Sequence, residues 1–227
     1  MADNTAILFF TRKPINESVN KVLCEKKKTN ILIHTNLFSQ TIKVLEQTCL
    51  PFSISFDTSN DSDSFGSKLY KASKEVFSRG FEHIIIIGND CPQLNPKKLS
   101  EAAKSIKNGK RVIGPDKRGG IYLLAISKND LDQINFINLP WQTEILTDTL
   151  KSNFKTSGKE FELLESLQDI NFTFDLKEII GCISSSNILK LIFQDLYFFQ
   201  KKFENIDEFL TLPDSSNKGL RAPPAFA

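Results

Sequence analysis

The residues of this chain whose types and spacing most clearly suggest chemistry are Gly88, Asn89 and Asp90, which directly follow four consecutive isoleucines. A short run of β-branched residues that ends at glycine is typical of a strand buried on both faces of a parallel sheet. In open α/β sheets, ligands bind at the carboxyl ends of the strands. Asp90 is therefore a candidate functional residue, at the place where such folds carry out their chemistry. The alternative is that Asp90 only caps the loop before the next helix.

The elements that would position Asp90 follow from the periodicity of apolar residues. Short apolar runs predict strands at 6–11, 30–34, 52–56, 83–87, 111–114 and 120–126. Helical spacing predicts helices at 65–79 and 96–108, the second with Asn95 as N-cap and Gly109 after its end. Strands that alternate with helices indicate an α/β fold, a Rossmann-like α/β/α sandwich with a mixed, mostly parallel central sheet.

Length and composition favour one main domain. The chain has 227 residues, of which 40% are hydrophobic and 25% charged, enough for a single substantial core. We predict a domain at 1–183 and a C-terminal segment at 184–227, formed by an aromatic helix and an extended tail. The apolar stripe of that helix (187–203) is typical of a side that closes the core, and a homodimer through this helix is the alternative.

Charge and targeting signals exclude several classes of protein. The formal net charge is only +2 and the basic residues are scattered, which argues against a nucleic-acid partner. No apolar stretch is long enough for a membrane span, and the first residues lack the features of a signal peptide. The four cysteines show no CxxC pair, which fits a reducing compartment. We expect a cytoplasmic protein.

Four segments, in this order, resemble one known family: GNDCPQL from Gly88, GPDKRGGIYLL from Gly114, LPWQTEIL from Leu139 and LQDINFTFDL from Leu167. The family is DUF2064, bacterial glycosyltransferase-like proteins of uncharacterised function within the GT-A, nucleotide-diphospho-sugar transferase superfamily. Its pattern is approximately GSDCPxL, then GPxxDGGYYL, WST and DxDTxxDL. The resemblance extends over about residues 6–180 and implies a GT-A type of sheet.

The resemblance also implies a site. In such folds a nucleotide lies over the first strands, and a divalent ion, Mg²⁺ or Mn²⁺, bridges its diphosphate to an acid that Asp90 matches. The implied substrate is a nucleotide sugar or a nucleoside triphosphate. The candidate contacts to this nucleotide-linked molecule are Arg12, Lys13, Asn89, Gly119 and Gly120. For Arg12 and Lys13, the alternative is that they are solvated surface cations.

The chain departs from the family pattern at several positions. A glycine of the first loop is Glu17, and the family's K-T-R triplet is Asn20, Lys21 and Val22. The acid before the two glycines is Arg118, a cation that inverts the local charge, although Asp116 could take its place. Asn171 replaces the middle acid of the last segment, where Asp169 and Asp175 persist, and for Asp175 we favour a helix-capping role over ligation.

Two functions remain open from the sequence. The first is a metal-assisted transferase that uses a nucleotide-linked donor and transfers a glycosyl or a nucleotidyl group, with Asp90 on the metal and no side-chain nucleophile. The second is a degenerate family member that acts as a binding or scaffolding protein. An active site should show Asp90 facing an open cleft with a second oxygen ligand in reach. A degenerate one should show Arg118 paired with Asp90, or a filled cleft.

Overall fold

The structure is a computed structural model that describes residues 4–57 and 63–179. Its strands are β1 (Thr5–Thr11), β2 (Phe52–Phe56), β3 (His83–Ile87), β4 (Arg111–Pro115), β5 (Ile121–Ser127) and β6 (Phe161–Leu163). Its helices are α1 (Pro14–Asn20), α2 (Lys27–Glu46), α3 (Phe65–Ser78), α4 (Pro96–Lys107), α5 (Asp130–Gln133), the 3-10 turn η1 (Phe136–Asn138), α6 (Leu146–Thr156) and α7 (Thr173–Ile179).

The strands form one six-stranded sheet in the order β2-β1-β3-β5-β4-β6. The pairs β1–β2, β1–β3 and β4–β6 are parallel, whereas β5 runs antiparallel to both β3 and β4. The predicted mixed, mostly parallel sheet is therefore confirmed. Because β1 and β3 are neighbours and parallel, the residues that follow them meet at the same edge of the sheet.

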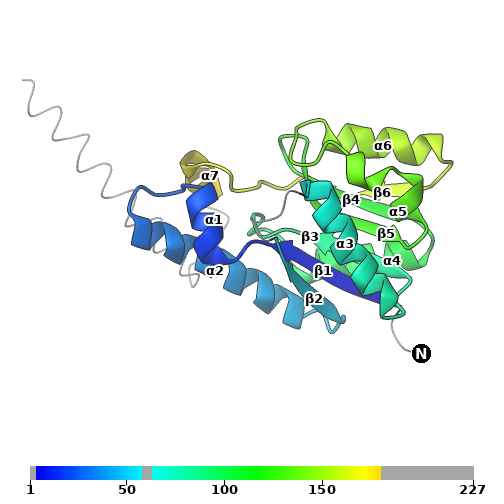
Figure 1. The fold of residues 1–227 in the computed structure, drawn as a ribbon, viewed down its shortest axis with the longest axis horizontal. Coiled ribbons are helices and arrows are strands. Elements are labelled where there is room, and N and C mark those ends of the chain that lie inside the picture. Colours follow the sequence, from blue (N-terminus) through cyan, green and yellow to red (C-terminus); the bar gives the residue numbers. More distant parts are fainter. Residues whose placement is uncertain (1–3, 58–62, 180–227) are drawn as a thin grey trace, which may run out of the picture.

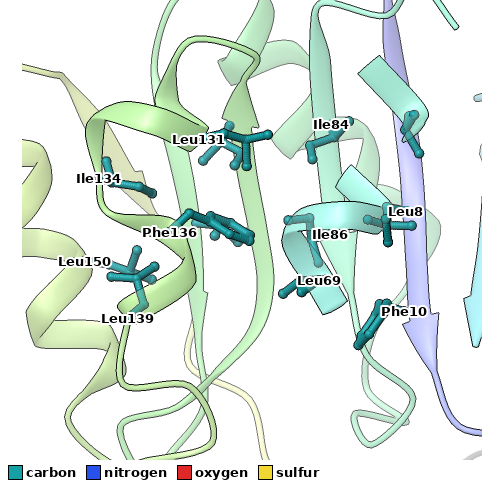
Figure 2. Close-up of a cluster of buried hydrophobic side chains, with 14 of the residues drawn as sticks. Leu8, Phe10, Leu69, Ile84, Ile86, Leu131, Ile134, Phe136, Leu139 and Leu150 are labelled. Carbon is teal, nitrogen blue, oxygen red and sulfur yellow. The ribbon is translucent and has the colours of Figure 1, made fainter. Parts of the chain in front are cut away.

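Helices cover both faces of this sheet and form the outer layers of the sandwich. Successive residues of β1 and β3 enter opposite cores, because side chains alternate along a strand. Leu8, Phe10, Ile84 and Ile86 pack against α3, α5 and α6, as Figure 2 shows for Leu69, Leu131 and Leu150. Ile7, Phe9, Ile85 and Ile87 pack against α2 and α4 on the other face. Burial on both faces explains the continuous isoleucine run.

Beyond the carboxyl end of β1, α1 and α7 lie beside each other (Figure 1). The hydroxyl of Thr173, the first residue of α7, donates to the carbonyl of Leu23 in the loop after α1, at 3.1 Å. The loop before α7 also reaches the end of β3, where Ile170 N–H donates to Asp90 O at 2.8 Å. Segments from both ends of the described chain therefore meet at this edge of the sheet.

The structure corrects one predicted strand. Residues 30–34 belong to helix α2, so Asp90 follows the third strand of the chain. The buried residues of α2 recur every three or four positions, at Asn30, Ile33, His34 and Leu37, which is helical spacing. A five-residue apolar run is too short for its period to separate strand from helix. The short edge strand β6 was not predicted.

One further prediction, the start of α4, is confirmed, whereas the predicted C-terminal segment cannot be compared with the structure. Helix α4 begins as expected, with the Asn95 side chain accepting from Lys98 N at 3.1 Å. The predicted C-terminal segment, including the helix at 187–203 and the homodimer through it, lies outside the described residues. Within the part of the chain that the structure describes, no helix is long and apolar enough to cross a membrane.

Candidate functional site

A cleft of about 690 Å³ opens at the carboxyl ends of β1 and β3. This volume lies within the range of small-molecule binding sites. The residues that line the cleft come from the ends of β1 and β3, from α1, from the turn between β4 and β5, and from the loops that precede α6 and α7. They include Arg12, Glu17, Lys21, Asp57, Asn89, Asp90, Asp116, Arg118, Gly120, Trp141, Asp169 and Asn171.

Asp90 faces this cleft, where it and two neighbouring oxygen atoms contact the ammonium group of Lys21. About one third of its side chain (32%) is exposed, and its Oδ2 accepts from Lys21 Nζ at 2.6 Å. The same ammonium donates to Ile170 O and to Asn171 Oδ1, both at 3.1 Å. We refer to Asp90 Oδ2, Ile170 O and Asn171 Oδ1 as the oxygen cage.

Helix α2 holds the backbone of Lys21 in place. Lys21 follows the last residue of α1, and its carbonyl faces His34 Nε2 at 2.9 Å and accepts from Asn30 Nδ2 at 3.1 Å. Asn30 also donates to Ser18 O at 2.7 Å and accepts from Leu23 N at 2.9 Å. Because Asn30 and His34 are buried, these bonds fix the course of the loop and the starting point of the Lys21 side chain.

Asp169 lies against the cage with an unusual protonation state. Its burial, and then the nearby charges of Asp90 and Asp116, raise its pKa to about 8. Its Oδ1 is buried and has no hydrogen-bond partner within the described residues. The carboxyl group therefore holds a proton at neutral pH, in a region where Asp90 supplies the negative charge.

Arg118, which replaces a family acid, pairs with Asp175 and not with Asp90. Its guanidinium donates two hydrogen bonds to the Asp175 carboxylate and lies over the rings of Phe172 and Phe174. The same carboxylate accepts from Asn171 N at 2.8 Å and Phe172 N at 2.7 Å. Burial would raise the pKa of Asp175, but these donors outweigh it and the pKa is lowered.

Gly119 and Gly120 serve the packing of the turn between β4 and β5. Gly119 has φ +90°, and a Cβ there would lie 1.8 Å from Glu144 O. A Cβ at Gly120 would lie 2.4 Å from Asp116 Oδ2. Asp116 Oδ1 accepts from the N–H groups of Arg118 and Gly120 at 2.6 and 2.9 Å, so this carboxylate already stabilises the turn. Gly120 lines the cleft.

The remaining candidate contacts differ in their position. Arg12 lines the cleft and forms ion pairs with Asp57 at 3.0 Å and Glu17 at 3.3 Å. Asn89 also lines it, and its buried Nδ2 has no partner within the described residues. Lys13 instead lies over the Phe56 ring, 5.7 Å from its centroid. The structure thus brings Arg12, Asn89 and Asp90 together, and it adds Lys21, which the sequence did not single out.

The donor atoms of the oxygen cage suit a hard divalent cation. Carboxylate, amide and backbone carbonyl oxygens are all ligands of Mg²⁺ and Mn²⁺. The cage offers only one carboxylate, and the described residues contain no cluster of three or more His, Cys, Asp or Glu side chains that could hold a metal. The cage therefore fits a cation that takes part of its coordination from water and from a bound ligand.

The chain is similar to known proteins both in sequence and in fold. Residues 34–143 match the family DUF2064, described as uncharacterized proteins conserved in bacteria. A crystal structure from Desulfovibrio desulfuricans G20, described as a candidate nucleotide-diphospho-sugar transferase, matches with a TM-score of 0.73 at 15% identity. That match covers 89% of this chain and 99% of the other.

A second structure, Rv0371c from Mycobacterium tuberculosis H37Rv, matches with a TM-score of 0.50 at 11% identity, covering 79% of this chain and 98% of the other. No curated protein matches the chain at a significant level. The family resemblance read from the motifs is thus confirmed: residues 34–143 carry the sequence pattern of DUF2064, on a fold of the nucleotide-diphospho-sugar transferase type.

Proposed function

We propose that this chain is a metal-assisted transferase that binds a nucleotide-linked donor in the cleft and transfers a glycosyl or a nucleotidyl group. The observation that carries this proposal is the convergence of Asp90 Oδ2, Asn171 Oδ1 and Ile170 O on one cation position in an open cleft. A ligand carboxylate with further oxygen ligands in reach is what an active site requires. Arg118 does not pair with Asp90, because it is bound to Asp175, and the cation that contacts Asp90 is Lys21.

In this proposal, Asp90 and Asn171 hold the divalent ion, with the carbonyl of Ile170 beside them. When bound, the ion neutralises negative charge on the diphosphate of the donor. Arg12 is the second cationic contact for phosphate at this edge of the sheet. Its Nε is buried and has no partner within the described residues, so it can donate to a ligand without breaking an existing bond.

The wall of the cleft can orient the rest of the donor. The unpartnered Nδ2 of Asn89 is a hydrogen-bond donor available to a ligand. Trp141 lines the cleft and packs on Phe136 and Phe65, with its Nε1 bonded to Phe136 O at 2.8 Å. A ring held in this way provides a rigid apolar surface for an acceptor or a sugar. The chain's own contribution is therefore positioning and charge placement.

A second candidate function is binding without transfer. It is favoured by the pairing of the cationic side chains that line the cleft, because Arg12, Lys21 and Arg118 each contact a carboxylate. A phosphate must compete with these acids for the same cations. Such pairing is also expected of a family member that keeps the fold and has lost the reaction.

Calorimetric titration with nucleoside diphosphates and nucleotide sugars, with and without Mg²⁺ or Mn²⁺, separates these functions. We expect metal-dependent binding by the wild type and its loss in Asp90→Asn. The matched control is Asp63→Asn, because Asp63 is a carboxylate of similar exposure (37% against 32%) that pairs with Lys71 away from the cleft. Nucleotide binding that is the same with and without metal, and that is retained in Asp90→Asn, would contradict the proposed transferase. It would favour the second function.

A further inference from the structure

We propose that the ammonium of Lys21 and a divalent cation are alternative occupants of the oxygen cage, so that a cation binds at Asp90 only when Lys21 leaves. This inference rests on the proposed function and adds to it a competing group within the chain itself. It concerns a residue at which the chain departs from the K-T-R triplet of its family.

Lys21 Nζ lies 2.6 Å from Asp90 Oδ2 and 3.1 Å from both other cage oxygens, so the three oxygens surround the nitrogen. Mg²⁺ binds oxygen atoms at about 2.0–2.1 Å and would need to lie among the same three atoms. One position cannot hold both groups, and a cation of charge +1 beside one of charge +2 is strongly repelled.

Lys21 also balances charge at the cage. Its ammonium lies 2.6 Å from Asp90 Oδ2, and Asp116 lines the same cleft. Removing the lysine charge leaves the Asp90 carboxylate without its cationic partner. The attraction for a free cation must therefore rise when Lys21 is neutralised.

Lys21 has a second acidic partner within reach. Glu17, one turn earlier on α1, has its Oε1 3.8 Å from Lys21 Nζ. The Lys21 backbone is fixed by Asn30 and His34, so only the flexible side chain has to move. A displaced ammonium therefore stays at the cleft, where it can contact a phosphate of the donor.

The test is titration of the protein with Mn²⁺ alone, followed by calorimetry and by the paramagnetic resonance of free Mn²⁺. We expect Lys21→Met to bind Mn²⁺ at least about ten times more tightly than the wild type, since a competing charge is removed. The matched control is Lys98→Met. Lys98 is as buried as Lys21 (14% and 15% exposed) and pairs with Glu165 outside the cleft, so its loss should leave Mn²⁺ affinity unchanged.

Two further variants keep the test decisive. Lys21→Gln retains a hydrogen-bond donor without the charge and should show the same gain, which guards against misfolding of the methionine variant. Adding Asp90→Asn to Lys21→Met should abolish the gain, which places the ion at the cage.

The outcomes separate this inference from the proposed function. Equal Mn²⁺ affinity in the wild type and both Lys21 variants would overturn the competition and leave the metal-assisted function standing. Weaker Mn²⁺ binding after loss of Lys21 would also overturn it. If no variant binds Mn²⁺, both the competition and the metal-assisted form of the function are wrong.

Discussion

Two ion pairs lie at the edge of the sheet that forms the cleft, and they differ in how firmly they are held. The Asp175 carboxylate is fully buried and accepts from Arg118, from two backbone N–H groups and from Gln168 Nε2 at 3.1 Å. The Asp90 carboxylate is about one third exposed, and among the described residues its one side-chain donor is Lys21. The first pair fixes the loop before α7, and the second can exchange its cation.

The contrast shows why Arg118, which stands where the family pattern has an acid, does not occupy Asp90. Arg118 inverts the charge at its position, but Asp175 and the rings of Phe172 and Phe174 hold its guanidinium away from Asp90. Lys21 has a flexible stem and one carboxylate within 3 Å. The arginine at position 118, which looks disabling in the sequence, therefore acts mainly on the structure of the loop before α7.

The largest expected effect concerns the buried pair. Asp175→Ala leaves the Arg118 guanidinium and two backbone N–H groups without their acceptor, so we expect a loss of about 3–5 kcal/mol in the free energy of unfolding. The control is Asp148→Ala, which removes an exposed pair with Lys151 and should cost less than about 1 kcal/mol. Urea denaturation measures both. Equal losses would show that the Arg118 pair is not structural.

A smaller effect is expected at the turn between β4 and β5. Gly119→Ala places a methyl group against Glu144 O in a left-handed conformation, and we expect a loss of about 2–3 kcal/mol. Gly158→Ala is the control, because Gly158 has φ +63° and open space around it, so that only the conformational cost of about 1 kcal/mol applies. A Gly119 variant no less stable than the Gly158 variant would mean that the turn can shift.

The pH dependence of the free energy of unfolding should reveal the raised pKa of Asp169. The pKa of Asp169 is about 8 in the folded protein, against 3.8 for an ordinary aspartate, so unfolding between these values releases a proton. The contribution of Asp169 therefore makes stability fall as the pH rises through this window. Asp169→Asn should flatten that fall and be more stable than the wild type at pH 8, by about 1 kcal/mol or more.

Urea denaturation at pH 5 and pH 8 checks this prediction. At pH 5 the advantage of the variant should be smaller than at pH 8, because asparagine resembles the protonated acid and pH 5 lies only a little above 3.8, where the loss of stability begins. A wild type and a variant whose stabilities fall in parallel from pH 5 to pH 8 would show that Asp169 is ionised in the folded protein.

The smallest effect on folding is expected at the exchangeable pair. Lys21→Met should cost less than about 1 kcal/mol without metal, because Asp90 stays partly hydrated when its partner is gone. Millimolar Mg²⁺ should then raise the melting temperature of the variant more than that of the wild type. A loss as large as that of Asp175→Ala would show that Lys21 is a structural residue.

How much of this could be read from the sequence depends on the range of the interactions. The end of β3 at Ile87 and the start of α4 after its cap Asn95 were predicted, since local composition and capping determine both. The strand predicted at 30–34 was wrong, because its apolar run is part of a helical stripe in which Asn30 and His34 are also buried. A helical stripe that includes buried polar residues is not recognised from the hydropathy of the sequence.

The arrangement of the cleft was less accessible. Lys21 meets Asp90 across 69 positions and Asn171 across 150, and Arg118 meets Asp175 across 57. No local pattern specifies pairings of this kind, because they depend on how α1 and the loop before α7 are placed against the sheet. The sequence motifs identified Asp90, whereas its pairing with Lys21 could be seen only in the tertiary structure.

The most direct test of the account is a crystal structure of the chain grown with Mn²⁺ and a nucleoside diphosphate, with the metal located by its anomalous scattering. We predict a metal peak among Asp90, Asn171 and the carbonyl of Ile170, with diphosphate oxygens on its open side and Lys21 Nζ displaced from Asp90. A diphosphate bound in the cleft with no metal and with Lys21 still on Asp90 would contradict it.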